Sequence, residues 1–403
     1  MRKLTIVFFD AGGGHRNAAE ALKVTLEQQS RPWDVRLMNL QEQLDAIDVV
    51  RRATGVRIQE GYNLILRKGW TRPTRQLLVL LRGLVRFYHG QVVARLETYW
   101  REHPADVALS VVPLFNRALA ESLHAAAPQT AFTTLLTDIA DCPPHFWIEE
   151  ESEFLICGSE RAEQQAFAAG HTRDRVFRTS GMVLKPKFYD KPQLNLRAER
   201  EKLGLHPDLP TGIVLFGGHG APVMAEIARR IDAGTAEVQQ ILICGHNRKL
   251  YAELAARRTR RPIRVEGFTS NVAHFMALSD FFIGKPGPGS ISEALQFDLP
   301  VIVERNARTM PQERYNTDWV LEKRLGIVLK DFREIASGVS QLLQPQTFAE
   351  LRANARAYTN RAIFEVPAIL EEVVERHVPV SAPVLTDAAM GCRTAWAEPI
   401  RLS

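Results

Sequence analysis

Short apolar runs alternate with amphipathic stretches along the first half of the chain. The run at 4–9 leads into a glycine-rich turn, and from His15 onward apolar residues recur on one face of a predicted helix. Further short runs, with helical stretches between some of them, lie at 35–40, 107–112, 131–136 and 154–157. Runs of this kind are typical of buried parallel strands. Strands that alternate with helices predict a parallel sheet with helices on both faces.

A second series begins after a proline-punctuated connection that covers 185–192 and 207–210. It opens with a strand at 212–216, continues through the glycine-rich turn 217–220 and enters a helix at about Val223. Further strands are predicted at 241–244, 263–266, 281–283, 301–303 and 327–329. The pattern predicts an α/β protein with two Rossmann-like doubly wound units, each of which opens with a strand, a glycine turn and a helix.

The length of 403 residues suits two domains of common size, which we place at 1–185 and 195–345. Helices over 346–377 are expected to pack back toward the first domain, and 378–403 is predicted to be a loose tail. Hydrophobic residues make up 45% of the chain and charged residues 24%. That balance is typical of a soluble globular protein and excludes collagen-like, disordered and mucin-like chains.

No apolar run approaches the ~20 residues that a membrane-spanning helix needs. The first run is interrupted by Asp10 and is too short for a signal peptide, so we expect a cytosolic chain. Reduced, mostly buried thiols are expected rather than a zinc or redox site, because the four cysteines are widely spaced. They are Cys142, Cys157, Cys244 and Cys392.

Basic residues are concentrated in one part of the chain. The net charge is only +5, but the segment 51–101 holds eleven Lys and Arg residues against Glu60 and Glu97. Apolar and aromatic residues such as Trp70 are mixed with them, which suits the interface of a membrane that bears anionic lipids. Ordinary core or interdomain packing is the alternative for these apolar residues. Nucleic-acid binding is not favoured, because no recognised binding module accompanies the charge.

The turn at 12–14 matches neither the dinucleotide fingerprint G-x-G-x-x-G nor the phosphate loop G-x-x-x-x-G-K-[ST]. In many α/β proteins such glycines serve tight turning alone. The turn also places backbone N–H groups beside a helix N-terminus, where an anion or a polar ligand is stabilised. By itself, His15 is either a structural or capping histidine or a reactive group.

The stretch 284–295 leaves a predicted strand, bends and starts a second helix of interest. Ser290 is its expected N-cap, and Glu293, three residues later, completes a capping box. Alternatively, the free N–H groups of Gly289 and Ser290 hold a diphosphate while Glu293 accepts hydrogen bonds from a ribose diol. Three polar residues downstream, either solvated or in contact with a ligand, are Gln312, Glu313 and Asn316.

In this order, the pieces resemble the lipid glycosyltransferases of the monogalactosyldiacylglycerol synthase type. That family has the GT-B architecture, in which two Rossmann-like domains face a central cleft, and is related to the N-acetylglucosaminyl transferase that completes lipid II. The resemblance covers the chain from 3 to 330. It rests on DAGGGHRNAAEA at 10–21, GGHG at 217–220, ICGHNRKL at 243–250, VEGF at 265–268, KPGPGSISEAL at 285–295 and QERYN at 312–316.

The resemblance implies a role for each matching residue. His15 takes the position of the base that acts on the acceptor hydroxyl, and it follows the glycines of the acceptor loop, Gly12, Gly13 and Gly14. In the donor site, Phe268 marks the loop that lies against the uracil. Gly289 and Ser290 match the diphosphate loop, and Glu293 matches the ribose ligand. Gln312 and Glu313 match the pair that contacts the donor sugar, and the other implied donor-site positions are Gly218, His219 and Asn316.

Two positions depart from the plant-type enzymes. Those enzymes have a longer turn with a glutamate where this chain has the turn 217–220. The turn of this chain is closer to that of the bacterial diacylglycerol glucosyltransferases. Pro311 also stands where a glycine usually precedes the Gln-Glu pair. The donor sugar therefore stays open among galactose, glucose and an N-acetylhexosamine.

The resemblance implies an inverting transfer of a hexosyl group from a UDP-sugar to a lipid acceptor, with 1,2-diacylglycerol expected, at the inner face of the cell membrane. A neutral histidine can deprotonate the acceptor, and a helix N-terminus can stabilise the departing UDP. No Asp-x-Asp motif is present, so we expect no metal or other cofactor. Two alternatives stay open: a UDP-sugar epimerase of the same architecture, and a non-catalytic UDP-sugar-binding protein.

Overall fold

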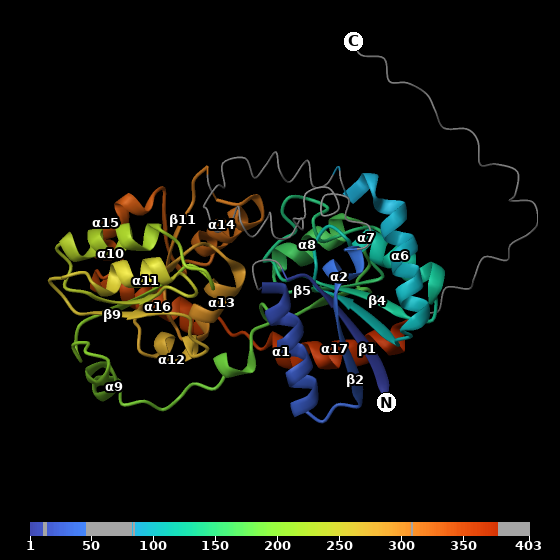
Figure 1. Ribbon diagram of the computed structural model, residues 1–403, viewed down its shortest axis with the longest axis horizontal. Coiled ribbons are helices and arrows are strands. Elements are labelled where there is room, and N and C mark those ends of the chain that lie inside the picture. Colours follow the sequence, from blue (N-terminus) through green and yellow to red (C-terminus); the bar gives the residue numbers. More distant parts are fainter. Residues whose placement is uncertain (11–13, 46–82, 84, 308, 378–403) are drawn as a thin grey trace, which may run out of the picture.

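Two α/β lobes stand side by side in the structure, a computed structural model that describes residues 1–10, 14–45, 83, 85–307 and 309–377 (Figure 1). The predicted tail at 378–403, Gly12, Gly13 and most of the basic segment 51–101 lie outside the described residues. Each lobe is built around a six-stranded parallel sheet. Among the described residues, no helix combines the length and the apolar character that crossing a bilayer requires.

The first sheet has the strand order β2-β1-β3-β4-β5-β6. Its strands are β1 (Arg2–Phe8), β2 (Trp33–Asn39), β3 (Val107–Ser110), β4 (Ala131–Leu135), β5 (Phe154–Cys157) and β6 (Val176–Arg178). Among the described residues that precede the second sheet, the helices of this lobe are α1 (Gly14–Gln28), α2 (Leu40–Leu44), α6 (His89–Glu102), α7 (Asn116–Ala126) and α8 (Glu160–Ala168). The strands β3, β4 and β5 are buried along their whole length, as expected for parallel strands covered on both faces. The pattern of apolar residues does not predict β6, because a strand of three residues is too short to show a recognisable apolar run or alternation.

The second sheet has the order β12-β11-β10-β7-β8-β9. Its strands are β7 (Thr211–Leu215), β8 (Gln239–Ile243), β9 (Ile263–Glu266), β10 (Phe281–Gly284), β11 (Val301–Glu304) and β12 (Gly326–Leu329). The elements around it include α9 (Leu196–Lys202), α10 (Val223–Ala233), α11 (Arg248–Ala255), α12 (Val272–Ala277), α13 (Pro288–Gln296), η2 (Pro311–Glu313), α14 (Arg314–Glu322) and α15 (Ile335–Leu342). Counted along the chain from β7, the order is 3-2-1-4-5-6, which is that of Rossmann domains. The predicted α/β class with two doubly wound units is confirmed.

The chain returns to the first lobe at its described C-terminal end, where α17 (Ala362–Arg376) lies beside α1 (Figure 1). Arg31 forms an ion pair with Glu371 of α17 at 2.7 Å. The preceding helix, α16 (Pro345–Ala357), stays in the second lobe, because its apolar residues join the cores there. Of the C-terminal helices expected to pack back toward the first domain, α17 does so and α16 does not. The α17 residues buried in the first core are Ile363, Val366, Ile369, Leu370 and Val373.

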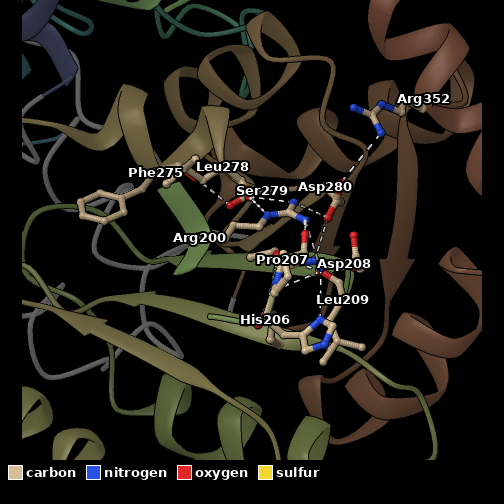
Figure 2. A network of polar contacts seen from close by, with 12 residues as sticks. Arg200, His206, Pro207, Asp208, Leu209, Phe275, Leu278, Ser279, Asp280 and Arg352 are labelled. Atoms are coloured by element: carbon tan, nitrogen blue, oxygen red, sulfur yellow. Dashed lines mark hydrogen bonds and ion pairs between the residues drawn. The ribbon is translucent and has the colours of Figure 1, made fainter. Parts of the chain in front are cut away.

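A polar network lies at the amino-terminal ends of β7 and β10, centred on Arg200 of α9 (Figure 2). The Arg200 guanidinium is largely buried, pairs with Asp280 Oδ2 at 2.8 Å and donates to the Leu278 carbonyl at 2.9 and 3.0 Å. Asp280 Oδ2 also accepts from the Thr211 amide at 2.8 Å. The network therefore fastens the chain that enters the second domain to the sheet end opposite the carboxyl-terminal loops.

Replacing Arg200 with alanine should lower the free energy of unfolding by about 3 kcal/mol, because Asp280, whose side chain is 21% exposed, would lose its main partner and keep only Arg352 at 3.9 Å. Chemical denaturation measures this change. Arg197 of the same helix provides a matched control, since its pair with Asp208 is solvent-exposed, and Arg197→Ala should cost less than about 1 kcal/mol. Equal losses in the two variants would contradict a structural role for the Arg200 network.

Candidate active site

Each sheet has one point where the direction of strand connection reverses. In the first sheet it lies between β1 and β3, and in the second between β7 and β10. Loops that leave the carboxyl ends of such neighbouring strands separate and form a crevice, where open α/β sheets bind ligands. All the predicted site residues that the structure describes follow strands in this way or lie on the helices and turns just after them. The fold therefore collects them at two crevices.

His15 occupies the crevice of the first sheet, in the first turn of α1. Its Nδ1 lies 3.1 Å from Thr137 Oγ1, beyond the end of β4, and its ring also forms a hydrogen bond to the backbone of Val111, beyond β3. These partners belong to neighbouring strands and not to the first turn of α1, so the described contacts do not support a capping role. Burial lowers the pKa of His15 to about 4, and the Val111 hydrogen bond offsets part of that shift. His15 is therefore neutral near pH 7 and able to accept a proton.

A buried carboxyl group lies next to Thr137. Asp138 is only 9% exposed, and its Oδ2 accepts a hydrogen bond from Trp147 Nε1 at 2.9 Å. The Trp147 ring in turn lies against His15, with ring centroids 5.8 Å apart. Burial raises the pKa of Asp138 to about 7, although the Trp147 hydrogen bond lowers it in part. Sequence reasoning assigned no role to Asp138 or Trp147; the available signal was a Thr-Asp pair at the end of a predicted strand.

A second aspartate holds the loop that carries Trp147. Asp141 accepts hydrogen bonds from three successive backbone amides: His145 at 2.9 Å, Phe146 at 2.9 Å and Trp147 at 2.7 Å. A carboxylate that binds several amides fixes a loop that lacks a regular hydrogen-bonding pattern. Asp141 therefore sets the position from which Trp147 reaches both Asp138 and His15.

Two glycine turns interlock at the carboxyl ends of β7 and β8. The amide of His246 donates to the Gly218 carbonyl at 2.9 Å. Gly245 has a φ of +58°, and a Cβ there would lie 2.2 Å from the Gly218 carbonyl oxygen. Only glycine fits at that position, because the close approach adds to the left-handed backbone conformation. The sequence places glycine where the two loops must cross.

Three exposed aromatic rings lie together here, two on the interlocked turns and one on the loop after β9. Phe268, just beyond β9, is 64% exposed and stacks on His246, with centroids 4.0 Å apart and an interplanar angle of 15°. The ring of His219 lies 5.8 Å from that of His246. The predicted positions Gly218, His219 and Phe268 thus come together, and His246, which sequence reasoning did not assign, lies between the two rings. A flat ring system has a surface here on which to stack.

The helix α13 begins three residues earlier than expected. Pro288 is its first residue and Gly287 is the N-cap, so Ser290 is not the N-cap and the predicted capping box with Glu293 is wrong. Proline at the first helical position supplies a fixed helical φ where no N–H partner is needed, which explains the earlier start. Gly289 and Ser290 consequently lie in the first turn, where backbone N–H groups have no intrahelical partner. A Cβ on Gly289 would meet no atom within 4 Å, so the space beside it is open.

Glu293 lies in the second turn of α13 and does not cap the helix. Burial raises its pKa to about 7, while the nearby Lys187 and Lys185 oppose the shift. Lys185 also pairs with Glu20 of α1 at 3.3 Å. The connection between the two domains therefore brings positive charge close to Glu293. The Glu293 carboxyl group is desolvated, and capping of α13 does not explain why it lies there.

The sugar-contact pair predicted from the resemblance lies on η2. Glu313 is 7% exposed and its Oε1 lies 2.9 Å from Lys285 Nζ, whose pKa that carboxylate raises. Gln312, beside it, is half-buried. Asn316 is fully buried, and its amide donates to the Pro286 carbonyl at 2.8 Å. Asn316 therefore supports the loop before α13 and has no exposed atom with which to contact a ligand.

The two crevices face one another. The charges of Lys285 and Glu313 act on Asp138 of the first domain, so the three groups lie near each other across the domain boundary. Arg161 of α8 also lies over the Tyr315 ring of α14, 5.8 Å from its centroid. In Figure 1, α13 and α14 lie on the side of the second lobe that faces the first. In the described part of the chain, no cluster of three or more His, Cys, Asp or Glu side chains has a metal-binding arrangement.

Solved structures share this two-lobed architecture. MurG of Acinetobacter baumannii aligns with a TM-score of 0.62 at 12% identity, over 92% of this chain and 100% of that one. Anabaena HepE, in complex with UDP, aligns with a TM-score of 0.54 at 15% identity, over 93% of this chain and 100% of that one. The architecture, with two Rossmann-like domains and crevices that face one another, is that of the GT-B proteins.

Sequence similarity defines the class more closely. Residues 212–372 match the glycosyltransferase family 28 C-terminal domain. The spinach (Spinacia oleracea) monogalactosyldiacylglycerol synthase is 27% identical over 399 residues, which cover 94% of this chain and 73% of the plant protein. The synthase 1 of Arabidopsis thaliana is 26% identical, over 93% of this chain and 72% of its own length. The chain therefore contains a glycosyltransferase family 28 C-terminal domain and is a distant homologue of the monogalactosyldiacylglycerol synthases over most of its length.

Proposed function

We propose that this protein transfers a hexosyl group from a UDP-sugar to the hydroxyl group of a lipid, 1,2-diacylglycerol, with inversion at the anomeric carbon. The observation that carries the proposal is the position of a neutral histidine, His15, in a crevice that faces the Lys285–Glu313 pair and the first turn of α13. A base on one domain and an anion-stabilising helix end on the other are what a displacement between two bound substrates requires.

The second domain is assigned the donor. The base of the nucleotide is proposed to lie at the Phe268 loop, and the diphosphate at the N–H groups of Gly289 and Ser290, where the helix N-terminus favours negative charge. Glu293 accepts hydrogen bonds from the ribose hydroxyls. Gln312 and Glu313 contact the sugar; in this role the 2.9 Å ion pair with Lys285 orients the Glu313 carboxylate.

The first domain is assigned the acceptor. His15 takes the proton of the lipid hydroxyl as the acceptor oxygen attacks the anomeric carbon from the face opposite the diphosphate. The bond between that carbon and the diphosphate oxygen breaks, and UDP leaves with the electron pair. Such a base typically contributes a factor of about 10² to 10⁴ to the rate.

Association with a membrane surface is part of the proposal. The basic segment 51–101 carries eleven positive residues, and its described end shows Phe87 79% exposed beside the exposed Arg86. An exposed aromatic ring next to basic residues suits the headgroup region of a bilayer with anionic lipids. The protein would then bind peripherally to the inner face of the cell membrane, where a lipid acceptor is available.

Product analysis tests the proposal. The purified protein is incubated with vesicles that contain diacylglycerol and with UDP-galactose, UDP-glucose or UDP-N-acetylglucosamine in turn, and the lipids are analysed by mass spectrometry and NMR. We expect a glycosylated diacylglycerol from one donor, with the opposite anomeric configuration. The rate should rise with the share of anionic lipid and fall with salt, since each basic residue near such a surface contributes about 1 kcal/mol. EDTA should leave the activity in place.

Three outcomes would contradict the proposal. Conversion of the UDP-sugar to its epimer without lipid would indicate the epimerase instead. Tight UDP binding with no product from any donor would indicate a non-catalytic binding protein. A transfer rate that depends on neither lipid charge nor salt would contradict the electrostatic contribution of 51–101 to membrane binding, while leaving the transfer reaction itself in place.

A further inference from the structure

The first-domain crevice holds a second titratable group that the proposed transfer does not use. Asp138 directly follows Thr137, whose Oγ1 lies 3.1 Å from His15 Nδ1. Asp138 Oδ2 also accepts from Trp147 Nε1 at 2.9 Å, and the Trp147 ring lies against the His15 ring. Two paths therefore connect the carboxyl group to the imidazole, one through the backbone to Thr137 and one through the indole.

The charged groups around Asp138 come from two places. Asp141 is on the same loop, and Lys285 and Glu313 lie across the domain boundary. Lys285 is already paired with Glu313 at 2.9 Å, so it does not serve Asp138 alone. In this setting burial raises the pKa of Asp138 to about 7 and lowers that of His15 to about 4. The usual order of the two pKa values is thus inverted.

We propose that Asp138 is a positioning residue for the transfer, whose carboxylate stabilises the positive charge that His15 acquires when it takes the proton of the acceptor. The inference rests on the proposed function. An isolated imidazolium in this crevice would be a desolvated cation, which is strongly disfavoured. An ionised Asp138, connected to the ring through Thr137 and Trp147, offsets the charge of the imidazolium, so proton transfer to His15 is favoured when Asp138 is ionised.

The pH dependence follows from the two titrations. Asp138 is protonated below its pKa of about 7, so turnover should fall as the pH drops through that value. His15 loses its ability to accept a proton only as the pH drops through about 4. A fall in rate near neutral pH would therefore report Asp138, and a second fall in acid would report His15.

The variant Asp138→Asn tests the charge with little change of shape, because the asparagine side-chain oxygen can still accept from Trp147 Nε1. At about pH 8 we expect kcat to fall about tenfold or more, with an unchanged KM for the UDP-sugar. Between about pH 5 and 8 the kcat of the variant should be flat, whereas that of the wild type falls through about 7. A variant that keeps the wild-type fall in rate would overturn the inference.

Two further variants separate the charge from the structure of the loop. Asp141→Asn alters a carboxylate that binds three backbone amides, so it should lower the melting temperature. Because the Asp141 charge raises the pKa of Asp138, the fall in rate should remain but move to lower pH. Trp147→Phe removes the indole donor that stabilises the ionised carboxyl group. The fall in rate should then move to higher pH, and an unmoved profile would count against the indole path.

An NMR titration tests the coupling without any transfer. The ¹⁵N resonances of the His15 ring, followed in the wild-type protein without substrates, should show an inflection near pH 7, where Asp138 ionises, that Asp138→Asn abolishes. A wild-type titration with no inflection near 7 would overturn the inference, even if transfer is observed. A wild-type protein that shows the inflection but makes no glycolipid would overturn the proposed function and leave the coupling established.

Discussion

Replacing His15 with alanine should reduce turnover by about two to four orders of magnitude, the usual effect of losing a general base. The reason lies in the contacts of the ring. Thr137 and Val111 hold it from two neighbouring strands, and burial keeps it neutral at the pH of the cell. Affinity for UDP should hardly change, because the proposed donor site lies on the other domain. Turnover, UDP affinity and the thermal midpoint should be measured on one preparation.

His124 provides a matched control for this variant. It lies in the last turn of α7 in the same domain, and burial also lowers its pKa. His124→Ala should change the thermal midpoint and leave turnover per folded molecule nearly intact. If the role of His15 were purely structural, His15→Ala would likewise change the thermal midpoint and leave turnover nearly intact. Near-normal turnover in His15→Ala would therefore disprove the assignment of His15 as the base.

Replacing Glu293 with alanine should weaken UDP binding by about one to two orders of magnitude, because a desolvated hydrogen bond to a charged group contributes about 1.5–3 kcal/mol. The structure leaves Glu293 without a capping role, since α13 begins at Pro288 with Gly287 as the N-cap. A loss of helix stability is therefore not the expected consequence. Calorimetry with UDP and a parallel melting curve separate the two effects.

The pH dependence of binding provides a second test of Glu293. Its pKa of about 7 means that the carboxyl group is protonated below that value, where it is a weaker acceptor for the ribose hydroxyls. Uridine, which has no titrating phosphate, should bind more weakly as the pH falls through about 7. Glu293→Gln keeps an acceptor oxygen and should remove this dependence. Unchanged UDP and uridine affinity in a folded Glu293→Ala would contradict the ribose role.

The start of α13 shows how far local sequence rules reach. Ser290 and Glu293 have the spacing of a capping box, yet the helix starts at Pro288. Both Ser290 and Pro288 are good residues for a helix N-terminus, and the path of the chain out of β10 decides between them. Asn316 of α14, 30 residues away, holds that path by its hydrogen bond to the Pro286 carbonyl, a contact that no local pattern contains.

Asp138 shows a different limit. Its position after a predicted strand is visible in the sequence, but an aspartate at the end of a strand is more often solvated. The exposure of 9% arises because the loop fixed by Asp141 brings Trp147 over it, and because the second domain closes the other side. These partners come from different parts of the chain, so the burial was not predictable.

Local patterns along the chain predict the alternation of strands and helices, the two glycine turns that open the doubly wound units, and the order of motifs that resembles the lipid glycosyltransferases. These features depend on neighbours within a few residues, where side-chain period and backbone conformation act directly. The sheet order, the true start of α13 and the inverted pKa values of His15 and Asp138 arise only when the chain is folded. The physical reason is that desolvation depends on groups that only the folded chain brings together.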